Sequence, residues 1–126
     1  MINVDKQVAY WRDSALEDWD VAGSLIQGGR QRHGLFFAHL ALEKMLKAHV
    51  CRQVKDVAPR IHNLVQLADR AKLTISSDQR AFLARFDQYQ QAGRYPDMLI
   101  KGPTLAKAKS ELQEAQEMMK WLIAQF

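Results

Sequence analysis

Apolar side chains recur at helical spacing along the first part of the chain. Between residues 3 and 27 they follow one another in steps of three or four positions, which aligns them on one face of an amphipathic helix: Val4, Val8, Trp11, Ala15, Trp19, Ala22 and Ile26. Gly28 and Gly29 come next, and glycine readily ends a helix. The pattern predicts a helix over residues 3–27 and a short loop leading to Gly34.

The next segment, residues 33–54, is apolar around most of its circumference, which is typical of a helix that packs on several neighbours at once. Its polar residues are therefore informative. His39, Glu43 and Lys47 follow one another at intervals of four, so they form one narrow polar stripe. We expect a buried, hydrogen-bonded His39 beside an ion pair of Glu43 with Lys47. A metal site is the alternative, but no other helix offers a Glu-x-x-His pattern to complete it.

Three more helices follow. Asn63 is a good N-cap for the third, and the polar cluster at residues 76–78 begins a fourth that runs to about residue 91. The last helix begins near Thr104 and carries a heptad seam that ends at Phe126. With short loops between them, these helices predict an all-α, up-and-down bundle of four or five helices. We expect residues 1–126 to form a single domain.

Composition narrows the class of protein. Of the 126 residues 48% are apolar and 25% are charged, which is the balance of a folded, soluble domain. Cys51 is the only cysteine, so the chain has no internal disulfide and suits a reducing compartment. The first 30 residues are too rich in charge for a signal peptide, and no apolar stretch approaches the ~20 residues that span a bilayer. We therefore expect a cytoplasmic protein with no membrane association.

Positive charge is concentrated in one part of the chain. The net charge is +4, and residues 30–60 alone carry seven cations against Glu43 and Asp56. All four histidines also lie in or next to this stretch. A basic segment of this kind favours a phosphate-bearing partner such as RNA or a nucleotide. A solvated surface with no specific partner is the other interpretation.

The sequence Arg94-Tyr95-Pro96-Asp97 combines three useful side chains on a proline-restricted turn between two helices. Arg94 could bind phosphate through two hydrogen bonds, and Tyr95 could stack on a base. In the structural alternative Arg94 pairs with Asp97 while Tyr95 packs on the bundle. No glycine-rich phosphate loop is present, and Cys51 lies in an apolar helix, where a free cysteine is usually unreactive.

Taken in order, four segments resemble the HEPN domain, a family of small prokaryotic helical domains. They are residues 10–25, residues 36–48 with the sequence FFAHLALEKMLKA, residues 59–64, and the Arg94–Asp97 turn. The resemblance covers about residues 8–122. It implies a bundle of four or five helices, commonly homodimeric and often paired with a separate minimal nucleotidyltransferase in a module like a toxin–antitoxin pair.

Many HEPN proteins are metal-independent ribonucleases that use an arginine followed four to six residues later by a histidine. No histidine follows Arg94 in this chain. The resemblance therefore favours a binding protein over an enzyme, with no metal or cofactor. In this hypothesis Arg94 and Lys47 hold phosphate, Tyr95 stacks, Asp97 orients Arg94 or a sugar hydroxyl, and His62 lies nearby.

Two alternatives remain open. The first is a metal-independent RNase toxin that uses Arg94 together with His62. The second is a helical assembly module that has no small-molecule site.

Overall fold

The structure, a computed structural model, describes residues 2–90 and 102–126. Within these residues it contains five helices and no strand, which confirms the predicted all-α bundle. The helices are α1 (Val4–Gln27), α2 (Gln31–Val54), α3 (Leu64–Arg70), α4 (Ser77–Phe86) and α6 (Leu105–Ala124). None of the described helices combines the length and the apolar character needed to cross a membrane.

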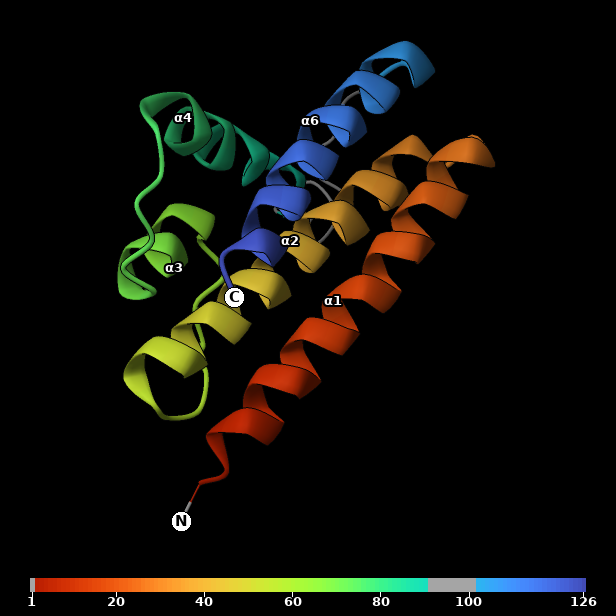
Figure 1. Ribbon diagram of the computed structural model, residues 1–126. Helices are drawn as coiled ribbons and strands as arrows, with labels where there is room; N and C mark the ends of the chain where they lie inside the picture. Colours follow the sequence, from red (N-terminus) through yellow and green to blue (C-terminus); the bar gives the residue numbers. More distant parts are fainter. Residues whose placement is uncertain (1, 91–101) are drawn as a thin grey trace.

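Helix α2 lies at the centre of the molecule, as its nearly continuous apolar surface predicts. It packs against α1 and α6 along its length and against α3 near its C-terminal half (Figure 1). Leu35, Leu42 and Leu46 have no exposed surface, so each side chain of this group stabilises the fold by about 1.5–3 kcal/mol through burial. The short helices α3 and α4 cover the side of α2 away from α1 (Figure 1).

The predicted helix starts are confirmed by their caps. Four polar side chains each accept a hydrogen bond from a backbone N–H in the first turn of α1, α3, α4 and α6: those of Asn3, Asn63, Ser76 and Thr104. These bonds satisfy donors that a helix leaves unpaired at its start. At the end of α1, Gly28 is the C-cap and Gly29 has φ of 83°, which only glycine adopts easily.

One boundary predicted from the sequence is wrong. The fourth helix ends at Phe86 instead of continuing to residue 91, although residues 88–90 are helical again. Asp87 interrupts the regular pattern, and its carbonyl accepts a bond from Gln90 N at 3.2 Å, three residues on. The break matters because the Asp87 side chain is directed toward α2 and α3, as the site below shows.

Helices α1 and α2 approach each other closely near the loop that joins them. Gly34 is buried in the first turns of α2, and a Cβ atom placed on it would lie 2.4 Å from Ile26 Cγ1 and 3.0 Å from the Ala22 carbonyl oxygen. Only a residue without a side chain allows this approach. Further along, Lys44 binds Ser14 and forms an ion pair with Asp18 at 2.7 Å, which ties the two helices together.

Candidate functional site

The polar stripe predicted on α2 exists and is almost completely buried. His39, Glu43 and Lys47 are 1%, 3% and 6% exposed, respectively. Ionisable groups are rarely buried to this extent unless they are paired, because removing a charge from water is costly. Their partners therefore define what this part of the molecule can do.

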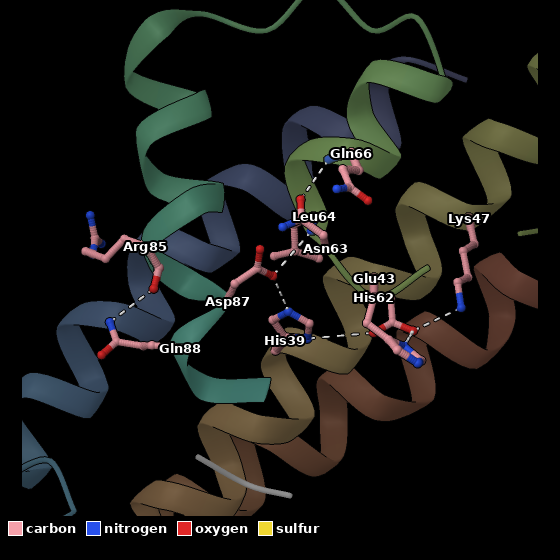
Figure 2. A network of polar contacts seen from close by, with 10 residues as sticks. All are labelled: His39, Glu43, Lys47, His62, Asn63, Leu64, Gln66, Arg85, Asp87 and Gln88. Atoms are coloured by element: carbon pink, nitrogen blue, oxygen red, sulfur yellow. Dashed lines mark hydrogen bonds and ion pairs between the residues drawn. The ribbon is translucent and has the colours of Figure 1, made fainter. Parts of the chain in front are cut away.

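Glu43 is the centre of the arrangement. Its Oε2 atom accepts hydrogen bonds from Lys47 Nζ and from His62 Nδ1, each at 3.0 Å (Figure 2). The other oxygen, Oε1, has no hydrogen-bond partner among the described residues, and His39 Nδ1 lies 3.9 Å from it. The structure thus brings Lys47 and His62, both predicted as site residues, to one carboxylate, and it confirms the expected Glu43–Lys47 ion pair.

Lys47 is held on two sides. Besides its bond to Glu43, the ammonium lies 5.2 Å from the centre of the Trp11 ring on α1, a cation–π distance. Its charge is therefore directed into the protein. Lys47 is 6% exposed and so offers little accessible surface to a phosphate, the ligand contact that the sequence predicts.

Asp87 is the site residue that the sequence reasoning missed. Its Oδ1 atom lies 2.8 Å from His39 Nε2 and accepts a hydrogen bond from Leu64 N at 3.3 Å (Figure 2). This single oxygen joins α2, the start of α3 and the end of α4, and it confirms that His39 is buried and hydrogen-bonded. One signal was available in the sequence, because Asp87 stands four residues after Leu83, on the apolar face of its helix.

A polar cleft of about 370 Å³ opens beside this network. Two of its lining residues, His62 and Asp87, belong to the network itself, and the His62 side chain is 48% exposed. The remaining lining residues come from the start of α3 and from the end of α4 and the turn after it: Asn63, Ala84, Gln88 and Gln90. The cleft therefore gives a ligand direct access to His62 and Asp87.

Three of the predicted site residues, Arg94, Tyr95 and Asp97, lie outside the described residues. The segment that carries them continues directly from Gln90, which lines the cleft. Their assignment as ligand-binding residues stays a prediction.

The excess positive charge of residues 30–60 is divided between the two ends of α2. Lys44 and Lys47, in the middle of the helix, are ion-paired. The other cations are exposed and form no ion pair in the described part of the chain: Arg30 and Arg32 at the start, and Arg52, Lys55 and Arg60 at or beyond the end. A helix of this length spans about 36 Å, so these cations form two separate surfaces, and the second precedes His62.

A second buried acid, Glu111 on α6, stabilises the end of α4. It accepts hydrogen bonds from Tyr89 Oη at 2.7 Å and from Arg85 at 2.9 Å. Burial alone would raise the pKa of Glu111, but these two bonds outweigh it and lower that pKa. Burial and the bond to Glu111 raise the pKa of Tyr89. This cluster is fully paired and holds the turn that carries Asp87.

The described residues give little support for a metal site or for a reactive cysteine. They contain no group of three or more histidine, cysteine, aspartate and glutamate side chains arranged to hold a metal ion. Cys51 is buried, and burial raises the pKa of its thiol, which disfavours the reactive thiolate. We assign the cleft next to His62 as the candidate site because it adjoins the buried polar network.

Comparison with known proteins agrees with the resemblance seen in the sequence. No match was found among curated protein sequences. The fold is similar to the crystal structure of TT1696 from Thermus thermophilus, with a TM-score of 0.81 over 95% of this chain and 98% of that one, at 20% sequence identity. The model of the HEPN domain matches residues 8–125. Nearly the whole sequence is thus accounted for by one family model, and the chain belongs to the HEPN domain family.

Proposed function

We propose that this HEPN protein is a binding protein that takes a nucleotide or a segment of RNA at the cleft lined by His62 and Asp87. One observation carries the proposal: His62 has one ring nitrogen fixed by the buried Glu43 while its side chain lines an open polar cleft. In the proposal Arg94 binds phosphate, Tyr95 stacks on a base and Asp97 orients Arg94, in a segment that continues from the cleft residue Gln90.

Surface charge supports a phosphate-bearing ligand. Lys55 and Arg60 are exposed, have no ion pair among the described residues, and lie in the connection that leads to His62. Unpaired cations on a protein surface raise the local concentration of anions and speed their association. Lys47 contributes in a different way, because its ammonium offsets the charge of Glu43 behind His62.

The family resemblance adds a proposal about assembly. We propose that the protein is a homodimer and acts with a minimal nucleotidyltransferase as its partner, in a module of the toxin–antitoxin type. Sedimentation equilibrium of the purified protein tests the first part. Co-purification from the native host, followed by identification of the bound protein and nucleotide, tests the second.

Calorimetric titration with ribonucleoside monophosphates and with a short single-stranded RNA tests the binding proposal. We expect saturable binding that weakens at least about tenfold in His62→Ala and in Arg94→Ala, the loss of one charge-assisted hydrogen bond. His33→Ala is the matched control, since His33 is exposed at the opposite end of α2. Absence of binding to either probe contradicts the proposal.

Two results would assign another function. Cleavage of RNA in EDTA that is abolished by both Arg94→Ala and His62→Ala would identify a metal-independent ribonuclease. If the affinities for nucleotide and partner do not change in Arg94→Ala, the remaining interpretation is a helical assembly module that has no small-molecule site.

A further inference from the structure

A second polar pocket, of about 330 Å³, lies at the start of α2. One side of it is formed by residues 29–33, which run from the turn after α1 into the first turn of α2. The other side is formed by Gly102 and Pro103, just before α6, and both helices begin at the same end of the bundle (Figure 1). Because these segments are distant in sequence, the pocket is made by the fold and not by a single turn. Its glycines and proline have no polar side chain, so the polar lining comes from four residues: Arg30, Gln31, Arg32 and His33.

The pocket is positively charged, and nothing in the described part of the chain neutralises it. No lining residue is acidic. The guanidinium groups of Arg30 and Arg32 are exposed and form no ion pair or hydrogen bond with the described residues. Two other arginines, Arg80 and Arg85, are paired with carboxylates. Like charges in one pocket repel each other, so an anion bound between Arg30 and Arg32 is stabilised by both.

We propose that this pocket binds a phosphate group, held by the guanidinium groups of Arg30 and Arg32. Arginine presents its N–H donors in a planar fork that matches two oxygens of a phosphate, and each such bond is strengthened by charge. The amide of Gln31, which also lines the pocket, supplies a further N–H donor. The inference goes beyond the proposed function, because it concerns another pocket and does not depend on a ligand at the cleft next to His62.

Two sources share this chemistry, a free phosphate ion and the backbone of an RNA strand. The register of α2 bears on the second. Arg32 and His39 are seven residues apart in this helix, so they lie on one face of it and about 10 Å apart along its axis. His39 bonds to Asp87, which lines the cleft. A stacked strand advances about 3.4 Å per nucleotide, so an RNA strand covers this axial distance with about three nucleotides.

Inorganic phosphate is the first probe, and the readout is the set of backbone N–H signals in nuclear magnetic resonance spectra at pH 8. At this pH phosphate carries two negative charges and an imidazole is neutral, so the two arginines supply the positive charge. We expect a saturable shift of the signals of residues 31–33. The affinity should fall at least about tenfold in Arg30→Gln and in Arg32→Gln, since each removes a charge-assisted hydrogen bond.

Two control variants separate the pocket from general surface charge. Arg70→Gln removes an arginine that is also exposed and has no ion pair within the described residues, but Arg70 does not line the pocket. His33→Ala leaves both arginines in place. Both variants should bind phosphate as the natural chain does at pH 8. The proposal is overturned if phosphate causes no saturable shift at residues 31–33, or if Arg30→Gln and Arg32→Gln bind it as tightly as Arg70→Gln does.

An oligonucleotide identifies the source of the phosphate. An RNA of about eight nucleotides with a 5′-hydroxyl end carries backbone phosphates only and is long enough for the axial distance. If it shifts the signals of residues 31–33 and binds at least about tenfold more weakly to Arg32→Gln, the pocket takes an RNA phosphate. If inorganic phosphate alone shifts them, the pocket takes the free ion. In both cases His62→Ala should leave the phosphate response of residues 31–33 unchanged, so failure of this pocket and failure of the proposed function are observed separately.

Discussion

Replacement of Gly34 by alanine tests the close approach of α1 and α2. The new methyl carbon would lie 2.4 Å from Ile26 Cγ1, whereas ordinary carbon–carbon contacts are about 3.5–4.0 Å. Ile26 is only 2% exposed, so its side chain has little room to rotate away. The second neighbour, the Ala22 carbonyl oxygen at 3.0 Å, is backbone and moves only with the helix. The two helices would therefore have to separate.

The expected cost follows from two opposing effects. Overpacking of a well-packed core costs about 1–3 kcal/mol, and alanine in place of glycine returns up to about 1 kcal/mol of helix propensity. Because one of the two clashes is with backbone, we expect Gly34→Ala to lower the free energy of unfolding by about 1–2 kcal/mol. With an m-value of about 1–3 kcal/mol/M, the midpoint of urea unfolding should fall by roughly 1 M.

Gly23→Ala is the matched control. Gly23 also lies inside a helix, but a Cβ atom placed on it meets nothing within 4 Å. The same chemical change should therefore raise the free energy of unfolding, by up to about 1 kcal/mol. Urea titrations followed by circular dichroism at 222 nm measure both variants. A Gly34→Ala protein as stable as the natural chain would show that α1 and α2 are not in contact as described.

Three further predictions concern buried groups. Leu42→Ala, at a fully buried position, should lower the free energy of unfolding by about 2–5 kcal/mol in urea titrations. Burial lowers the pKa of His49, so stability should decrease as pH falls through about 6.5, where the unfolded chain takes up the proton first, and His49→Gln should lack this decrease in thermal melts. The lowered pKa of Glu111 means that its contribution is present above about pH 4.5 and is lost as pH falls through the pKa of the folded state; Glu111→Gln should have a flatter stability profile on the acid side.

Each of these predictions has a result that contradicts it. Loss of less than 1 kcal/mol in Leu42→Ala would place this residue outside the core. His33→Gln, an exposed histidine, is the control for His49, and an equal loss of pH dependence in both would remove His49 as its source. For Glu111 the control is the exposed Glu117→Gln, and identical acid profiles for the two variants would show that burial of Glu111 is unimportant.

Much of the fold follows from the sequence because local signals agree with one another. The three- and four-residue steps of α1, the apolar circumference of α2 and the caps at Asn63 and Thr104 each depend on neighbours in the chain, so pattern alone locates them. The spacing of Glu43 and Lys47 is a local signal too, and the pair forms as predicted.

The site is less predictable because its main contacts are distant in sequence. His62 meets Glu43 across 19 residues, and His39 meets Asp87 across 48. Nothing next to Asp87 in the sequence indicates that its carboxylate will also accept the Leu64 N–H group. An acidic residue on the apolar face of a helix is the available clue, and the same clue marks Glu111, which follows Ala108 by three positions.

The hairpin of α1 and α2 also favours one order of assembly. These two long helices are consecutive and joined by three residues, so their pairing can begin with the local contacts next to the loop and extend along the hairpin. Helix α6 reaches the same central helix from the far end of the chain, where closing the loop costs more entropy. A chain leaving the ribosome can therefore pair α1 with α2 first. In this order the cleft, which needs the start of α3 and the end of α4 together, is completed later.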